Sequence, residues 1–202
     1  MLNKRKIRDI LRLSKAILCF GIYIPHLIAY YINGGGRKQI DTDVNVLAYQ
    51  VHLKLPRILL LLFFLHNNRY FRVVFYHRLG PVWSTLIGWY RPGDKYFTIG
   101  KTVKIGHSFW FAHPYGTVLA ADSIGHHFRC IHLTTLGNTS KGCRPTIGNY
   151  VSLGANVTII GAVHIGNNVR VGAGTVIVKD VPDNCVVVGN PARIVRHLEP
   201  IE

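Results

Sequence analysis

Eleven histidines are the side chains of this 202-residue chain best matched to proton transfer near neutral pH. One of them, His113, opens the short segment His113–Gly116, which reads HPYG. A hydroxyl that attacks a carbonyl must lose its proton, and a neutral imidazole suits that step. The alternative for a lone histidine near a strand corner is a purely structural role. No histidine pair shows an HxxxH or HExxH spacing, so we expect no metal site.

The cysteines are spread along the chain without CxxC spacing. They are Cys19, Cys130, Cys143 and Cys185. This distribution argues against a zinc site and against a disulfide framework, and it favours reduced thiols in a cytoplasmic protein. Neither Cys130 nor Cys143 has an evident activating neighbour, so we do not expect a cysteine nucleophile.

A six-residue repeat runs from Ile147 to Val181 and determines how such side chains are positioned. An aliphatic residue opens each block, and a small β-branched residue usually follows four places later. The openers are Ile147, Leu153, Ile159, Ile165, Val171 and Ile177. A helical turn of about 3.6 residues would spread this period over every face, whereas a parallel β-helix points each opener into its core. A sandwich of short strands, the alternative, would show alternation broken by turns.

Further hexads occur earlier in the chain, opening at Ile99, Ile105, Phe111, Ile124, Cys130 and Leu136. The stretch Gly137–Thr146 interrupts the pattern, so we expect an inserted loop there, and projecting loops commonly carry function. Cys185–Val188 should form the last strand, and a tail should follow from Arg193. The chain is therefore expected to divide into a helical region, residues 1–96, and a β-helix domain, residues 97–202.

The helical region carries most of the positive charge. The net charge is +15, of which residues 1–98 contribute +11, from fifteen basic and four acidic residues; residues 99–202 contribute +4, from nine and five. No DNA- or RNA-binding module is recognisable, so nucleic acid is not an expected partner. The basic residues lie among long apolar runs, which favours association with a membrane surface through residues 1–90.

Residues 1–15 form a candidate basic amphipathic helix, and residues 16–32 are almost wholly apolar. No cleavage site of small residues follows, so a signal peptide is not expected. A membrane span, a helix lying in the interface and a buried helical cap remain three interpretations of residues 16–32. Asn33–Gly36 should break the helix, and residues 37–57 are polar and mixed.

Two further stretches of the helical region are rich in apolar side chains. Ile58–Leu65 reads as a buried or interfacial helix, too short to cross a membrane. Arg69–Gly80 alternates basic and aromatic residues, and its Arg69, Arg72 and Arg78 are candidates to meet lipid phosphates. The alternative is a helix with one packed aromatic face.

The repeat domain resembles the hexapeptide-repeat acyltransferases, on Ser123–Leu153 and on the ending VVVGNPARIV. It is more similar to the serine acetyltransferase branch, which includes capsule and exopolysaccharide O-acetyltransferases, through FAHPYGTVL, IHLTTLGN, PTIGNYVSLGANVTIIG and VGAGTVIVKDVP. The resemblance covers roughly residues 97–196. It implies a mainly β protein with a left-handed parallel β-helix that forms a homotrimer, with active sites between neighbouring subunits.

The resemblance also implies an acetyl-CoA-dependent O-acetyltransferase in which His113 is the general base. His132, one coil away, is the second candidate for a catalytic role, and Arg144 and Tyr115 are the expected acceptor-binding residues. The residues expected to bind acetyl-CoA are Gly154, Ala155, Gly172, Ala173, Lys179 and Arg193. No metal and no covalent intermediate are implied. We expect the enzyme in the cytoplasm or at the cytoplasmic face of the membrane.

The chain departs from the serine acetyltransferase pattern at three positions. The family has aspartates at the positions of Thr98 and Ala112 and a second histidine at the position of Arg144. Those groups orient the base and hold the amino acid, and Asp94 or Asp122 would have to replace them. We therefore expect a sugar hydroxyl of a surface polysaccharide as the acceptor. Serine, for cysteine biosynthesis, is the alternative, and a non-catalytic β-helix scaffold is the third interpretation.

Overall fold

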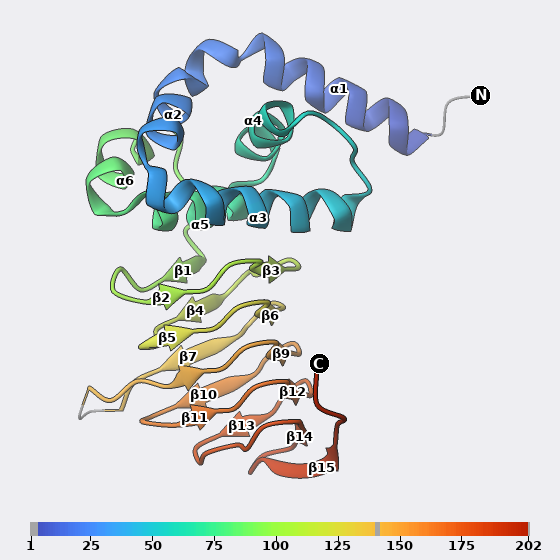
Figure 1. Cartoon of the computed structure of the whole chain (residues 1–202), viewed down its shortest axis with the longest axis vertical. Helices are drawn as coiled ribbons and strands as arrows, with labels where there is room; N and C mark the ends of the chain where they lie inside the picture. The colour runs from blue at the N-terminus through green and yellow to red at the C-terminus, as the bar shows by residue number, and fades with distance from the viewer. Residues whose placement is uncertain (1–3, 140–141, 202) are drawn as a thin grey trace. The chain divides into compact units, whose positions relative to one another are not determined.

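The computed structural model describes residues 4–139 and 142–201. The chain forms two compact units, Met1–Asp94 and Lys95–Glu202. The first consists of helices, and the second consists of short strands wound into a solenoid (Figure 1).

Three sheets form the walls of the solenoid, and successive coils add strands to each wall in turn. Sheet A holds β1 (Phe97–Ile99), β4 (Thr117–Leu119), β7 (Thr135–Gly137), β10 (Thr158–Ile160) and β13 (Val176–Ile177). Sheet B holds β2 (Lys104–Ile105), β5 (Ser123–Ile124), β8 (Thr146–Ile147) and β11 (His164–Ile165). Sheet C holds β3 (Trp110–Phe111), β6 (Arg129–Cys130), β9 (Ser152–Leu153), β12 (Arg170–Val171), β14 (Cys185–Val188) and β15 (Arg193–His197).

The hexads account for both the walls and the core of the solenoid. Every opener from Ile105 to Ile177 is buried. Beyond the insertion the parallel strands pair three hexads apart, as Ile147 does with Ile165. Gly148 occupies a corner where an added Cβ would lie 2.7 Å from the carbonyl carbon of Gly166, so a side chain would not fit. The predicted parallel β-helix is confirmed.

The expected tail after Arg193 is wrong. Residues Arg193–His197 form β15, which runs antiparallel to β14 and pairs Val186 with Arg196. The run Arg-Ile-Val-Arg is compatible with a strand, because β-branched side chains fit a pleated surface, and the outer edge of β14 offers backbone groups to pair with.

The insertion leaves the wall where the hexad pattern is lost. Strand β7 ends at Gly137 and β8 begins at Thr146, and the loop between them projects from the solenoid (Figure 1). Arg144 Nη1 donates a hydrogen bond to Thr102 Oγ1 at 2.9 Å, so the returning part of the loop is tied to the first coil.

Helices account for most of the first unit, in the part of the chain that the structure describes. They are α1 (Lys4–Leu18), α2 (Phe20–Ile32), α3 (Gly34–Val51), α4 (Arg57–Asn67), α5 (Arg69–Leu79) and α6 (Pro81–Gly88). The helix breaks at Asn33, between α2 and α3, within the predicted stretch Asn33–Gly36, but the three glycines form the first turn of α3. Asn33 caps the helix by accepting a hydrogen bond from Gly36 N at 3.2 Å. An added Cβ on Gly36 would lie 2.5 Å from Arg78 O, so close packing against α5 requires the glycine.

Helices α4 and α5 form the core of the helical unit. Arg72 and Arg78 are buried, and Arg78 Nε donates to Asp43 Oδ2 at 3.0 Å. Arg69 Nε donates to Asp94 Oδ2 at 2.7 Å. The prediction that these arginines meet lipid phosphates is wrong for Arg72 and Arg78, whose guanidinium groups are buried and donate to acceptors within the unit. Arg69 is 58% exposed, and its contact with lipid stays a prediction.

Among the described residues, no single helix is long and apolar enough to cross a bilayer. Two bent pairs reach the required length and composition when each pair is taken together: α1 with α2, bent by 79°, and α4 with α5, bent by 115°.

Candidate active site

The solenoid has three corners, named here AB, BC and CA after the sheets that they join. In the first coil, the CA corner carries His113. Phe111 pairs with Cys130, and Val118 pairs with Thr135. Val118 follows Phe111 by seven residues in the first coil, whereas Thr135 follows Cys130 by only five in the next coil. The two additional residues make His113–Gly116 a bulge on this corner.

His113 lies on the bulge with its side chain exposed. Its φ of +48° falls in the left-handed region, which is uncommon for residues other than glycine. Tyr115 N donates to His113 O at 2.7 Å and closes a tight turn. Within the part of the chain that the structure describes, the imidazole of His113 makes no hydrogen bond and no ring contact. The side chain is therefore accessible to a substrate.

Tyr115, predicted to bind the acceptor, stands on the same bulge. Its ring centroid lies 5.0 Å from that of Tyr96, and the rings are tilted by 54°. The two residues are 49% and 47% exposed. Lys95 Nζ lies 4.8 Å from the Tyr96 ring centroid. Sequence reasoning missed Tyr96 and Lys95, because only the strand pairing of the structure, Phe97 with Thr117, places Tyr96 beside Tyr115 of the following coil.

The CA corner also brings together most of the residues expected to bind acetyl-CoA. Backbone hydrogen bonds link this corner from coil to coil, from Leu133 N to Tyr115 O (2.9 Å), Asn156 N to His132 O (3.0 Å) and Gly174 N to Ala155 O (2.9 Å). An added Cβ on Gly154 would lie 2.7 Å from Ala173 N, so the coils approach closely there. One edge of the solenoid therefore carries His132, Gly154, Ala155, Gly172 and Ala173. Arg193 lies on the last coil of this edge, where it pairs with Val188.

Two predicted residues lie at another corner of the same chain. Lys179 is exposed at the AB corner, just after β13. Arg144 is also at the AB corner, where it bonds to Thr102. Within one chain, the structure does not bring either residue beside His113.

The aspartates suggested as replacements for the missing orienting groups do not contact His113 within this chain. Asp94 is buried and paired with Arg69. Asp122 is exposed at the AB corner, where its backbone N donates to Pro145 O at 3.0 Å. Ala112, directly before His113, offers only a methyl group.

The cysteines near this site are not poised for attack. Cys130 is fully buried in the solenoid core, and burial raises the pKa of its thiol to about 12. A thiol rather than a thiolate is therefore present near neutral pH, and the thiolate is the nucleophilic form. Cys143 is exposed on the insertion.

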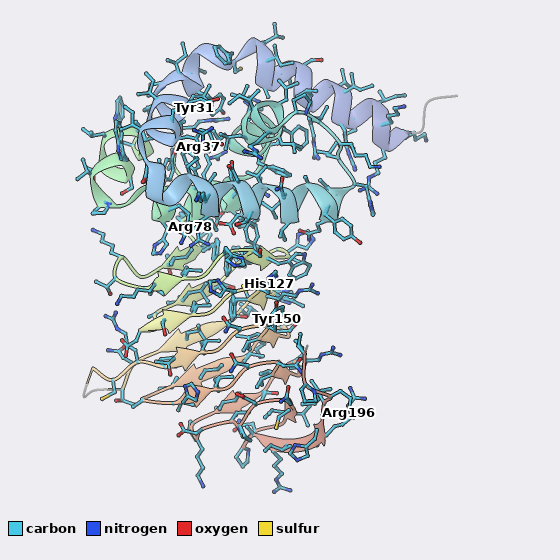
Figure 2. All side chains as sticks on the ribbon, in the orientation of Figure 1. Tyr31, Arg37, Arg78, His127, Tyr150 and Arg196 are labelled. Atoms are coloured by element: carbon cyan, nitrogen blue, oxygen red, sulfur yellow. The ribbon has the colours of Figure 1, made fainter. Side chains whose placement is uncertain are left out.

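Three other histidines gather at the BC corner. The rings of His107 and His126 stack at 4.1 Å, and the ring of His127 stacks on that of Tyr150 at 4.6 Å (Figure 2). His126 Nδ1 accepts a hydrogen bond from His107 N at 3.1 Å, which gives the ring a structural role. Burial, followed by the charges of His107 and His126, lowers the pKa of His127. No group of three or more His, Cys, Asp or Glu side chains that could hold a metal occurs among the described residues.

Comparison with known proteins agrees with this fold. The family profile "Bacterial transferase hexapeptide (six repeats)" matches residues 144–179. The chain is 40% identical over 96 residues to a serine acetyltransferase of Synechococcus elongatus, a match that covers 46% of this chain and 39% of that protein. It is 43% identical over 102 residues to the putative colanic acid biosynthesis acetyltransferase WcaB of Escherichia coli K12, a match that covers 48% of this chain and 62% of that protein.

A solved structure extends the likeness beyond the solenoid. The crystal structure of Neisseria gonorrhoeae serine acetyltransferase superposes with a TM-score of 0.63 and 25% identity, covering 82% of this chain and 67% of that one. The chain spans less than two thirds of the two curated relatives. Residues 144–179 thus match the hexapeptide-repeat profile, and the solenoid is similar to serine acetyltransferases and to WcaB.

Proposed function

We propose that this chain is an O-acetyltransferase that moves the acetyl group of acetyl-CoA to a sugar hydroxyl in polysaccharide biosynthesis. The observation that carries the proposal is the bulge at the CA corner, which holds the exposed His113 imidazole beside the Tyr96–Tyr115 pair. Similarity to acetyltransferases supports the reaction type. We propose a cytoplasmic location, because buried thiols such as those of Cys130 and Cys185 suit a reducing compartment.

In the proposed reaction, His113 is the general base. Its neutral imidazole takes the proton of the acceptor hydroxyl while the hydroxyl oxygen attacks the carbonyl carbon of the thioester. The tetrahedral intermediate then collapses, the carbon–sulfur bond breaks, and the CoA sulfur takes the proton from the imidazolium. The products are an acetyl ester and free CoA. The acetyl group never bonds to the protein, which is consistent with the buried thiol of Cys130.

The acetyl-CoA is proposed to lie along the CA edge below His113. The pairs Gly154–Ala155 and Gly172–Ala173 carry no side chain larger than a methyl group, so a pantetheine arm can approach the backbone closely there. Arg193, on the last coil of this edge, suits the phosphates. We propose a homotrimer in which the AB corner of one subunit faces the CA corner of the next. That arrangement would bring Arg144 and Lys179 to a neighbour's site.

The choice of a sugar over serine rests on the residues around His113. Thr98 and Ala112 supply no carboxylate for the ammonium group of an amino acid. The Tyr96–Tyr115 pair offers exposed aromatic rings, on which the C–H face of a sugar ring can pack. Serine is kept as the second candidate, because the similar proteins include serine acetyltransferases.

The test measures free thiol released from acetyl-CoA by the full-length protein. Serine and a panel of surface oligosaccharides are offered in separate reactions, and CoA binding is measured by calorimetry. A higher kcat/KM with an oligosaccharide than with serine supports the proposal. The reverse order assigns the protein to serine acetylation. Release with neither acceptor, together with no CoA binding, would identify a non-catalytic scaffold.

A further inference from the structure

We propose that the helical unit docks onto the surface of an anionic lipid bilayer through α1 and α2. This inference concerns a surface remote in the sequence from the acetyl-transfer site, and it does not depend on the acceptor. It narrows the membrane contact expected for residues 1–90 to α1 and α2, which carry most of the exposed large apolar side chains of the helical unit.

Helix α1 presents two different stripes to solvent. Its buried side is marked by Ala16, and α1 packs on α4 with the opposite side open along the outer edge of the unit (Figure 1). The exposed apolar side chains recur at helical spacing, at Ile7, Ile10, Leu11, Ile17 and Leu18. A second stripe holds the exposed basic side chains of Lys4, Arg8, Arg12 and Lys15. An apolar stripe flanked by cations is the pattern of a helix that lies in a bilayer interface.

Helix α2 continues the apolar surface after the bend. Phe20, Ile24, Ile28 and Ile32 follow one another at four-residue spacing, and Ile24 and Ile28 are 45% and 48% exposed. An open groove on this side of α2 is lined wholly by apolar and aromatic residues, namely Phe20, Ile24, Leu27, Ile28, Tyr31 and Ile32. The guanidinium of Arg37 lies 4.7 Å from the Tyr31 ring centroid, so a cation borders the groove (Figure 2). A tyrosine and a cation beside apolar side chains suit the headgroup level of a bilayer.

The charge of the helical unit specifies which bilayer. Residues 1–98 include only four acidic residues, and the structure places three of them in ion pairs with arginines of the unit: Asp41 with Arg57, Asp43 with Arg78, and Asp94 with Arg69. The fourth, Asp9, lies on α1 itself. That helix carries six basic residues against this one carboxylate, so it keeps a net charge of +5. An anionic surface attracts such a cluster within a Debye length of about 8–10 Å.

A second groove combines apolar side chains with positive charge. It has a volume of about 460 Å³ and lies between the start of α1 and residues 51–55. Arg5, Lys6 and Lys54 supply three cations against the single carboxylate of Asp9, and Ile10 and Leu13 contribute to the apolar lining. A phospholipid carries the matching chemistry, with an anionic phosphate joined to acyl chains. The linings of both grooves therefore favour the same partner as the charge of the unit does, namely a phospholipid surface.

Flotation of the full-length protein with vesicles tests the proposal. The vesicles are made of phosphatidylcholine alone or of phosphatidylcholine mixed with phosphatidylglycerol. We expect the protein to float with the mixed vesicles, and its binding to weaken as salt is raised. R8E/R12E should lower the partition coefficient on the order of tenfold or more, because it reverses two cations of the basic stripe. I24Q/I28Q should lower it as well, by removing two apolar anchors while keeping good helix formers.

The matched control is K101E/K104E, which makes the same charge change on exposed lysines of the solenoid and should float like the wild type. Circular dichroism confirms that each variant is folded. A wild type that stays out of the mixed vesicles would overturn the proposal, as would an R8E/R12E variant that floats normally. A smaller oligomer for I24Q/I28Q in light scattering without vesicles would show instead that a second copy of the chain covers this face.

Discussion

The guanidinium of Arg78 donates to the carboxylate of Asp43 at 3.0 Å, and each of the two side chains is only 2% exposed. This pair joins α5 to α3 inside the helical unit. Because a buried charge left without its partner is strongly unfavourable, R78A should lower the free energy of unfolding by about 3–5 kcal/mol. Urea denaturation measures the loss. The double variant R78M/D43L should recover much of it, since it removes both charges, and a single variant as stable as the wild type would contradict the assignment.

His113 should be essential for transfer and dispensable for folding. H113N removes the base, while asparagine tolerates the left-handed φ of +48° at this position. We expect kcat/KM to fall by about 10²–10⁴ with CoA affinity unchanged, as for loss of a general base. The matched control is H132N, on the next coil of the same corner, which should lose less than about tenfold. If the losses of the two variants were reversed, His132 would be the base.

The Tyr96–Tyr115 pair should govern acceptor binding. Y115A and Y96A should each raise the KM for the sugar acceptor by about tenfold, through loss of a stacking surface, and leave the KM for acetyl-CoA unchanged. Y150A is the matched control, because Tyr150 is also a half-exposed tyrosine but lies at the BC corner. An equal effect of all three substitutions would argue against a specific acceptor site.

Gly154 should be required by the close approach of two coils. In G154A the new Cβ would lie 2.7 Å from the backbone N of Ala173, so we expect a loss of about 1–3 kcal/mol in the free energy of unfolding. In G137A the nearest atom to the new Cβ is 3.8 Å away, and that variant should be nearly neutral. Thermal unfolding of both variants, with CoA affinity measured alongside, checks the contrast.

His26 should make the helical unit less stable in mild acid. Its ring is fully buried, and burial, followed by the charges of Arg72 and Arg91, lowers its pKa to about 4. The unfolded chain has a pKa near 6.5 at this residue, so it binds the proton first as the pH falls. Stability should therefore fall between about pH 6.5 and pH 4, by about 3 kcal/mol in all. H26Q should flatten this pH dependence in urea denaturation, whereas an unchanged slope would exclude His26 as its source.

The solenoid could be predicted from the sequence because its information is local and periodic. Each hexad opener, such as Leu153 or Ile159, is a buried residue, so one hexad is enough to predict which of its side chains lies in the core. The insertion was found for the same reason, since the period stops after Leu136 and restarts at Ile147. The parallel β-helix, the loop and the position of His113 on a corner all follow from this one pattern.

The details around His113 could not be predicted in that way. The bulge depends on how many residues separate two paired positions in adjacent coils, and pairing is not visible along a single strand. The burial of Arg72 and Arg78 depends on acceptors far away in the sequence, among them Asp43, so a basic and aromatic stretch looked like a membrane surface. Tyr96 was missed because its partner Tyr115 belongs to the following coil.

Strand β15 affects how the end of the solenoid can associate with other molecules. A stack of parallel strands ends in a row of unpaired backbone groups, which can recruit a strand from another molecule and start uncontrolled growth. In sheet C, the antiparallel return of Arg193–His197 along β14 occupies that row. The basic side chains of Arg193 and Arg196 then border the outermost strand, and like charges discourage a second molecule from stacking there. The five-residue strand β15 thus hinders the addition of further strands to this end of sheet C.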